Sequence, residues 1–593
     1  MCGIIGYLGS KDAFPVIFES LKKLEYRGYD SWGIAVKGEA GLDIHKQTGK
    51  ISDYNTENSR LRESKSRMGI GHSRWATHGK VCETNAHPHT DCSGNIAVVH
   101  NGIIENFQEL KDELQDHNFI SETDSEVIPH VIESHMQAGA SFEDAVKQTS
   151  KKLRGRYAIV AINMDSDKMV AVRNGSPLIL GVMKHKGGND FFVASDVPAF
   201  LEHTKDVMYL DDDEMVVLGQ DAAFHNTHTG QDVFKRLITI DWSEAQAHKG
   251  DYDHFMIKEI MEQKETIRNS INQDESRIKE VADEINNAYG TFFTACGTAG
   301  NVCLAGEYIF SKVAGKHINY IVSSEFPNYK HFLTDRTLMI TVSQSGETAD
   351  VLEAIKAAKE RNVKILSLVN VMGSSVYRQS DHNFLINAGP EKAVASTKAT
   401  TAQLALITLL AYASAGKLSE GRRLLIDTAG KVNDMLNPRY EEHIRKLAET
   451  ICNNDHIYII GRGVNYSMAL ESAIKIMEVS YIHAHGFAGG ELKHGPIALI
   501  DKGVPCIALV ANDDVRNDVI SNATEIRSRG GYIIGVAPEN HEIFDYWIRV
   551  PDVGIASPIV NIIPVQILAY HLAVLRGCDP DYPKNLAKSV TVK

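Results

Sequence analysis

Short hydrophobic runs dominate the first 240 residues of the chain. Seven of them have the alternation or the apolar continuity of β-strands, and they occupy residues 3–9, 32–38, 95–104, 157–164, 169–175, 191–195 and 214–219. Patterns with helical spacing lie between these runs at Val16–Leu24, Phe107–Leu114 and Ser125–Met136. This part of the chain therefore predicts a domain in which helices cover sheets.

The pattern changes after residue 240. Charged and turn-forming residues cluster from Asp241 to Asp253, and the polar stretch Phe255–Ile285 predicts one long helix. From Tyr289 onward, apolar strand patterns alternate with helical ones, which is typical of doubly wound α/β domains. We therefore divide the chain into a first domain at 2–240, a linker with a connecting helix at 241–285, two α/β subdomains at 286–430 and 431–582, and a tail at 583–593.

An internal repeat supports two α/β subdomains in tandem. The segment TFFTACGTAGNVCLAGEYI (291–309) resembles HIYIIGRGVNYSMALESAI (456–474). Three pairs of identical residues stand 164 positions apart: Gly297 and Gly461, Asn301 and Asn465, and Glu307 and Glu471. The match is short, so a chance agreement between two strand–glycine–helix segments stays open as an alternative.

Composition narrows the class of protein. The net charge is −14 and no dense lysine or arginine block occurs, which argues against binding to nucleic acid or to an anionic membrane. The eight cysteines form no C-x-x-C pair and indicate a reducing compartment. The longest apolar stretch, Ala402–Ala415, is shorter than the roughly 18 residues of a membrane span. Lys11 and Asp12 precede any long apolar run, so we expect no signal peptide and a cytoplasmic protein.

Cys2 is the first candidate for chemistry. Removal of Met1 would leave a thiol and a free α-amine on the same residue. Such an amine has an ordinary pKa of about 7.7–8.0 and would serve as the base for the thiol. A chance cysteine at a frayed terminus is the alternative that these residues alone leave open.

The loop Ser343–Thr348 is a second candidate. It lies between an apolar strand pattern at 337–342 and a helical pattern at 349–360, and a helix N-terminus attracts anions. Its three hydroxyls and one glycine would wrap a phosphate, although a simple N-cap needs only one hydroxyl. Ser396 belongs to another hydroxyl cluster before a helix. The equivalent loop of the second repeat, 511–514, carries acids, so we expect one phosphate site per chain.

A third candidate is a charged stripe on one helix. Glu471, Lys475 and Glu478 are four and three residues apart and therefore share a face. An apolar stripe runs beside them and consists of Leu470, Ile474, Met477 and Tyr481. We therefore expect the charges to lie at the edge of the core. A surface Glu–Lys pair is the alternative. His494 follows in a glycine-rich segment, and Lys588, near the C-terminus, is a candidate for a Schiff base.

Motifs across the chain resemble one enzyme family. MCGIIGY, LEYRGYDS, GHSRWATHG, NAHPH, VVHNGIIEN and SETDSE resemble an N-terminal-nucleophile (class II) glutamine amidotransferase domain. ACGTA, SQSGETADV, VASTKA, GELKHGP and NLAKSVTVK resemble paired sugar-isomerase (SIS) domains. In this order, over nearly all residues, they resemble the glutamine–fructose-6-phosphate aminotransferases (isomerizing), also called glucosamine-6-phosphate synthases.

The resemblance implies both fold and reaction. The fold would be an αββα amidotransferase domain followed by two doubly wound SIS subdomains. The reaction would convert D-fructose 6-phosphate and L-glutamine to D-glucosamine 6-phosphate and L-glutamate, the first step of hexosamine (UDP-N-acetylglucosamine) biosynthesis. Such an enzyme is a transferase of nitrogenous groups that needs no cofactor, and its partners would be the two substrates and a second copy of the chain.

The resemblance also implies roles in the first domain. Cys2 would attack the glutamine amide carbon, with its own α-amine as the base. Asn101 and Gly102 would form the oxyanion hole, aimed at charge that develops in the tetrahedral intermediate.

Four further residues complete the glutamine site in this resemblance. Arg74 and Thr77 would hold the α-carboxylate, since an arginine fork suits a carboxylate, and Asp124 would hold the α-ammonium. Trp75 would gate an ammonia channel between the two sites. The alternatives are a helix capping box for Asp124 and core packing for Trp75.

Five histidines crowd the same region: His72, His78, His87, His89 and His100. Their spacing matches no known metal site, so we interpret them as structural and expect no metal.

In the isomerase half, the resemblance assigns contacts with the sugar phosphate to Thr298, Ser343, Gln344, Ser345, Thr348 and Ser396. Lys588 would form a Schiff base with the C2 ketone. Glu478 would move a proton between C1 and C2, with Glu471 and Lys475 in support. His494 would open the sugar ring from the neighbouring subunit, which implies a homodimer.

One departure and several alternatives remain. Ala299 stands where the family has a serine, which predicts phosphate binding weaker by one hydrogen bond, about 1 kcal/mol. Two other enzymes stay open as alternatives: a glutamine amidotransferase that feeds another sugar phosphate, and a deglycase that works in reverse. A phosphoribosyl-diphosphate amidotransferase shares only the N-terminal half. A sugar-phosphate sensor would need neither Cys2 nor Lys588.

Overall fold

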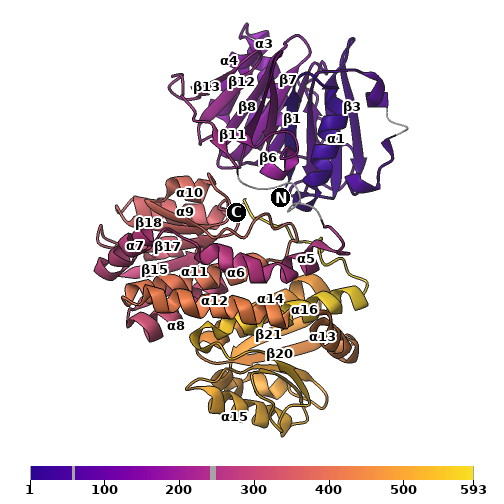
Figure 1. Ribbon diagram of the computed structural model, residues 1–593. Coiled ribbons are helices and arrows are strands. Elements are labelled where there is room, and N and C mark those ends of the chain that lie inside the picture. Colours follow the sequence, from indigo (N-terminus) through magenta and orange to yellow (C-terminus); the bar gives the residue numbers. More distant parts are fainter. Residues whose placement is uncertain (1, 57–59, 241–248, 592–593) are drawn as a thin grey trace. The chain divides into compact units, whose positions relative to one another are not determined.

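The computed structural model describes residues 2–56, 60–240 and 249–591. The chain divides into two compact units, Met1–Ala247 together with Ala587–Lys593, and His248–Leu586 (Figure 1). Each unit is described by itself below. Part of the expected charged linker, residues 241–248, lies outside the described residues.

The first unit contains two antiparallel sheets. The eight strands of the first are, in spatial order, β14 (Ile238–Thr239), β11 (Asp206–Tyr209), β9 (Ile179–His185), β10 (Gly188–Ala194), β1 (Gly3–Leu8), β4 (Met68–Arg74), β2 (Ser31–Lys37) and β3 (Leu42–Thr48). The six strands of the second are β13 (Ala222–Asn226), β12 (Glu214–Leu218), β8 (Met169–Asn174), β7 (Gly155–Asn163), β6 (Ile96–Ile104) and β5 (His89–Thr90). All seven predicted strands are confirmed.

The two sheets pack face to face around a shared core. Ile4 and Ile70 of the first sheet belong to the same buried cluster as Val160 and Ala171 of the second. Helix α1 (Ala13–Lys23) packs on β1 and β4, while α3 (Val127–Gln137) and α4 (Phe142–Lys152) bury apolar residues with the second sheet. The shorter α2 (Phe107–Glu113) contacts α3. The unit is therefore an αββα sandwich, as expected.

The second unit contains two five-stranded parallel sheets. The first has the order β16 (Ile318–Val322), β15 (Thr291–Ala295), β17 (Leu338–Ser343), β18 (Lys364–Val369) and β19 (His382–Leu385). The second has the order β21 (His483–Ala488), β20 (His456–Gly461), β22 (Pro505–Leu509), β23 (Tyr532–Ala537) and β24 (Tyr546–Arg549). The strand order is the same in both, which confirms the tandem repeat.

Helices cover these sheets, most of them in one continuous apolar core and those at 349–359, 375–379 and 516–527 in two smaller clusters. The helices are α5 (Phe255–Met261), α6 (Gln263–Ile271), α7 (Glu275–Asn287), α8 (Gly297–Ala314), α9 (Ala349–Lys359), α10 (Ser375–Gln379), α11 (Lys398–Ser414), α12 (Leu418–Met435), α13 (Pro438–Ile451), α14 (Val464–Ser480), α15 (Arg516–Arg527) and α16 (Ser557–Leu575).

Two expectations from the sequence were wrong. The stretch 255–285 is not one helix but α5, α6 and most of α7, because Asp274 caps a new helix by accepting a hydrogen bond from the Arg277 N–H at 2.9 Å. The longest apolar helix is not the one at Ala402–Ala415 but Gly554–Leu575, and 89% of its most apolar 18-residue stretch is buried inside the protein. Such burial is typical of a core helix.

Candidate active sites

Cys2 lies directly before β1, at one end of the first sheet. Its Sγ accepts a hydrogen bond from the Trp75 N–H at 3.2 Å and lies 3.4 Å from the Trp75 carbonyl oxygen. Burial raises the pKa of the Cys2 thiol, and the Trp75 N–H opposes that rise. The thiol is thus held in place beside the end of β4.

Asn101 and Gly102 reach this point from β6 of the second sheet. Asn101 donates through Nδ2 to the Cys2 carbonyl oxygen at 3.0 Å, and His72 Nε2 lies 3.0 Å from Asn101 Oδ1. Gly102 has φ +131°, and a Cβ there would lie 1.9 Å from the Arg156 carbonyl oxygen. Only glycine fits this position. Of the two predicted oxyanion donors, Asn101 thus contacts Cys2 directly, and Gly102 is the next residue along β6.

Asp124 is buried in the loop before α3. Its Oδ2 accepts a hydrogen bond from the Ile104 N–H at 2.7 Å, and its Oδ1 faces His78 Nδ1 at 4.0 Å. The capping-box alternative is not realised, because Glu126 is the N-cap of α3 and makes no side-chain cap. One carboxylate oxygen is therefore fixed by backbone, while the other points at a partly exposed imidazole.

The other predicted glutamine contacts lie on the segment after β4. The buried Arg74 guanidinium donates to the backbone oxygens of His78, Gly79 and Lys80, so it shapes the loop 78–80. Thr77 is exposed. Trp75 is half-buried and packs edge-to-face on Tyr29 at 5.6 Å, a partly open position that differs from core packing.

Four of the five histidines are buried: His72, His87, His89 and His100. His72 and His87 stack at 4.1 Å, and His100 Nδ1 lies 2.8 Å from Ser125 Oγ. Burial lowers the pKa of His72 to about 3 and that of His100 to about 4. These rings are therefore neutral at physiological pH, and His72 is the one that bonds the Asn101 side chain.

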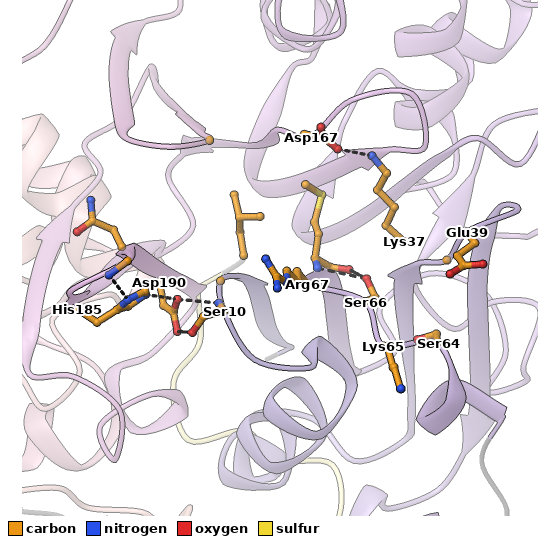
Figure 2. Close-up of a pocket in the computed structure, with 17 residues that line it drawn as sticks. Ser10, Lys37, Glu39, Ser64, Lys65, Ser66, Arg67, Asp167, His185 and Asp190 are labelled. Carbon is orange, nitrogen blue, oxygen red and sulfur yellow. Dashed lines mark hydrogen bonds and ion pairs between the residues drawn. The ribbon is translucent and has the colours of Figure 1, made fainter.

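A cavity of about 610 Å³ opens elsewhere in the first unit, around Gly9, Lys65 and Arg67 (Figure 2). An ion pair of Lys37 with Asp167 at 2.8 Å lines it, and so does a contact of His185 Nε2 with Asp190 Oδ1 at 3.0 Å. Gly9 follows β1 whereas Cys2 precedes it, so the cavity lies about one strand length, roughly 20 Å, from the thiol. It contains none of the predicted site residues.

In the second unit, the loop Ser343–Thr348 forms a tight arch between β17 and α9. Ser343 Oγ accepts a hydrogen bond from the Gly346 N–H at 3.0 Å, and Ser345 Oγ accepts one from the Glu347 N–H at 3.2 Å. Gly346 has φ +66°, which favours glycine. Thr348 is the N-cap of α9, but its side chain makes no capping bond. The first-turn N–H groups of α9 thus keep their donor capacity for an anion.

Ser396 lies at the start of α11 and is tied to Glu391. Its Oγ donates to Glu391 Oε2 at 3.1 Å, and the same carboxylate accepts hydrogen bonds from the Thr397 and Ala399 N–H groups at 2.9 and 3.0 Å. Sequence reasoning missed Glu391, because it caps the helix from outside it.

The charged stripe lies on α14. Lys475 Nζ is 3.5 Å from Glu471 Oε1 and 2.6 Å from Glu478 Oε2. Thr298 and Asn301 of α8 donate to the two oxygens of Glu471, each at 2.9 Å. Thr298 thus contacts the acid stripe rather than the Ser343–Thr348 loop.

The expected position of this stripe was wrong. Glu471 and Lys475 are fully buried, whereas Met477 of the neighbouring apolar stripe is 37% exposed. Helix α14 turns its charged face toward α8, where Thr298 and Asn301 supply hydrogen bonds that compensate for burial. Burial raises the pKa of Glu471, although Lys475 opposes the rise. Burial would lower the pKa of Lys475, but the two glutamates outweigh it and raise that pKa.

His494 and Lys588 stay predictions. His494 is exposed and ends a short 3₁₀ helix, Gly489–His494, that follows β21. Lys588 belongs to the C-terminal segment of the first unit, which Arg156 holds by donating from Nε to the Thr591 carbonyl oxygen at 3.0 Å.

Comparisons with known proteins cover both units. A glutamine amidotransferase domain matches residues 72–202, and a SIS domain matches twice, at 284–413 and 450–576. The chain is 45% identical over 607 residues to glutamine–fructose-6-phosphate aminotransferase (isomerizing) of Thermococcus kodakarensis, and 45% identical over 605 residues to that of Methanothermobacter thermautotrophicus. In both cases all of each chain is covered.

A solved structure agrees with these relatives. The C-terminal domain of glucosamine-fructose-6-phosphate aminotransferase from Francisella tularensis is 33% identical, with a TM-score of 0.52, and covers 57% of this chain and 100% of its own. Identity at this level over complete chains, with both kinds of domain in the same order, places the chain in the family of glutamine–fructose-6-phosphate aminotransferases (isomerizing).

Proposed function

We propose that this protein converts D-fructose 6-phosphate and L-glutamine to D-glucosamine 6-phosphate and L-glutamate. The observation that carries this proposal is similarity over the full length to relatives of that name. The geometry of each unit fits one half of the reaction. Glutamine and water give glutamate and ammonia in the glutaminase half, and ammonia and the ketose phosphate give the amino sugar phosphate and water in the isomerase half.

In the glutaminase half, Cys2 Sγ attacks the amide carbon and forms a thioester as ammonia leaves. The α-amine of Cys2, once Met1 is removed, takes the thiol proton and returns it to the leaving nitrogen. Asn101 Nδ2, oriented by His72, and the Gly102 N–H donate to the oxyanion. Water then cleaves the thioester and releases glutamate.

Three residues bind the α-ammonium and α-carboxylate groups of glutamine and so select this substrate. Asp124 Oδ1 accepts from the α-ammonium, because its Oδ2 is already held by the Ile104 N–H. Arg74 and Thr77 bind the α-carboxylate. Trp75, whose backbone holds the thiol, moves with substrate and gates the path of ammonia to the second site.

In the isomerase half, the phosphate sits on the Ser343–Thr348 arch at the N-terminus of α9, with Gln344 and Ser396 nearby. Lys588 forms a Schiff base with the C2 ketone and releases water. Ammonia then attacks C2 and displaces the Lys588 amine. Glu478 then moves the proton between C1 and C2. Among the three charges of α14, Glu478 alone has an exposed side chain, at 25%, whereas Glu471 and Lys475 are fully buried and position it.

The test is a coupled assay. The purified protein is incubated with both substrates, and glucosamine 6-phosphate and glutamate are followed by mass spectrometry. We expect equal amounts of both products, lost in Cys2→Ala and kept in the matched control Cys82→Ala, another partly exposed cysteine. Glutamate without amino sugar would point to another acceptor, and neither product, from protein lacking Met1, would contradict the proposal.

We further propose that the active form is a cytoplasmic homodimer in which His494 opens the ring bound by the partner chain. Co-expression of His494→Ala and Glu478→Gln chains tests this. If His494 acts across the interface, each mixed dimer contains one complete site and recovers activity that neither variant has alone. If His494 acts within its own chain, co-expression restores nothing.

A further inference from the structure

Four side chains with metal-binding atoms converge in the first unit, and none of them is among the predicted glutaminase residues. Cys92 lies in the turn between β5 and β6, His117 follows α2, and His130 and Glu133 lie on one face of α3. Their ligand atoms all lie within 4.8 Å of one another. No step of the proposed reaction uses any of them.

Five of the six distances within this cluster are close to those of a tetrahedral shell. Cys92 Sγ lies 3.5 Å from His117 Nδ1 and 3.4 Å from His130 Nδ1. The two Nδ1 atoms are 3.2 Å apart, and Glu133 Oε2 lies 3.1 and 3.7 Å from them. Around Zn²⁺, with bonds of about 2.0–2.3 Å, tetrahedral geometry separates ligands by roughly 3.3–3.6 Å.

Hydrogen bonds explain these contacts poorly. Each of the four atoms carries at most one proton, and each proton points at a single partner. Glu133 Oε2 already accepts a hydrogen bond from the Cys92 N–H at 3.0 Å. One cation at the centre would satisfy all four ligand atoms together.

The surroundings hold the ligands in place. The side chain of His130 is 1% exposed, and its Nδ1 faces the cluster while Nε2 lies 3.9 Å from Glu126 Oε1. Gln137 donates from Nε2 to the second oxygen of Glu133 at 3.3 Å. Carboxylates and amides behind the ligands are typical of metal sites, since they orient imidazole and carboxylate groups.

We propose that Cys92, His117, His130 and Glu133 form a structural Zn²⁺ site. One thiolate, two imidazoles and one carboxylate suit Zn²⁺ better than Mg²⁺ or Ca²⁺, which prefer oxygen. The ion ties together a strand turn, a loop and a helix, and it closes the segment that carries Asp124. The ligands are separated by 24, 12 and 2 residues, so the sequence contains no short motif that indicates the site. This is why the sequence led us to expect no metal.

Cobalt substitution tests this proposal on the full chain. We would use reduced protein in a Cys2→Ala background, because Cys2 offers another thiol beside an amine. We expect one Zn²⁺ per chain by mass spectrometry of the metal, and one Co²⁺ per chain after exchange, with a thiolate-to-cobalt charge-transfer band and intense tetrahedral d–d bands. Zinc should also raise the melting temperature of the chelator-treated protein.

Matched variants separate the site from general metal binding. Cys92→Ser and His117→Ala should each weaken Co²⁺ binding by more than about 100-fold, and Cys92→Ser should remove the charge-transfer band. Cys82→Ser and His135→Ala, in the same unit but outside the cluster, should keep both. Cys92 is exposed, so its variant should retain the wild-type circular dichroism spectrum. Absence of a saturable band, or an unchanged band in Cys92→Ser, would overturn the proposal, and neither result depends on the synthase reaction.

Discussion

The two SIS sheets have the same strand order but different residues on the helix that follows the first strand of each copy along the chain, β15 or β20. Helices α8 and α14 correspond with an offset of 164 residues. At three positions along them, the first copy has Glu307, Ser311 and Ala314 where the second has Glu471, Lys475 and Glu478. Ser311 is exposed, while Lys475 is buried between two carboxylates.

The loops after the third strand of each copy differ in the opposite sense. The first copy has the hydroxyl arch Ser343–Thr348, and the second has acids, of which Asp514 pairs with Lys312 at 2.5 Å. Burial raises the pKa of the neighbouring Asp513. Hydroxyls and helix N–H groups suit an anion, whereas carboxylates repel it. We infer that the first copy of the repeated fold binds the phosphate and that the second copy carries out proton transfer.

The largest expected effect comes from removing the buried cation of the second copy. Lys475→Met leaves Glu471 buried without its counter-ion, which should lower the free energy of unfolding by about 3–5 kcal/mol and abolish synthase activity. Denaturant unfolding measures the change in the free energy of unfolding, and product formation measures the loss of synthase activity. The matched first-copy variant Ser311→Met is exposed and should change stability by less than about 0.5 kcal/mol.

A double variant sharpens this result. Glu471→Gln with Lys475→Met removes both charges and should recover most of the lost stability but no activity. If Lys475→Met alone were as stable as the wild type, the buried ion pair of α14 would be ruled out.

The loop comparison predicts the next largest effect. Ser345→Ala should raise the KM for fructose 6-phosphate by about 10- to 100-fold, because a hydrogen bond to a charged group is worth about 1.5–3 kcal/mol. Asn512→Ala in the equivalent loop should change that KM less than about twofold. Steady-state kinetics at saturating glutamine measures both, and equal effects of the two variants would place the phosphate elsewhere.

The two aligned asparagines provide a smaller contrast. Asn301 donates to Glu471, whereas Asn465 donates to Ser557 Oγ at 3.0 Å. Alanine at either position leaves a buried partner unsatisfied and should cost about 1–3 kcal/mol of stability. Only Asn301→Ala should also lower kcat, because it alone touches the charged stripe. A loss of kcat in Asn465→Ala of the same size would remove this distinction.

The smallest effect concerns the hydroxyl that the first copy lacks. Ala299→Ser should lower the KM for fructose 6-phosphate about fivefold, the equivalent of one hydrogen bond of about 1 kcal/mol. Ser311→Ala, further along α8, is the control and should leave KM unchanged. A KM that rises in Ala299→Ser would mean that the added hydroxyl crowds the site instead of binding phosphate.

Much of the fold followed from local pattern. The seven predicted strands of the first unit exist because period-two alternation and apolar runs fit sheets with one or both faces buried. The repeat in sequence predicted two sheets of equal topology. The break at Asn272–Asp274 escaped prediction, because polar composition suits a helix interior and a helix cap almost equally.

The sequence by itself determined the order of the domains, the tandem repeat and the residue types of each candidate site, since these depend on spacing along the chain. Tertiary structure decided which side chains are buried. Helix α14 presents both a charged and an apolar stripe, and hydrogen bonds from α8 together with the ion pairs of Lys475 offset the cost of burying the charged one. Tertiary structure also brought together Cys92, His117, His130 and Glu133, because residues far apart in sequence meet only where strand turns, loops and helices pack.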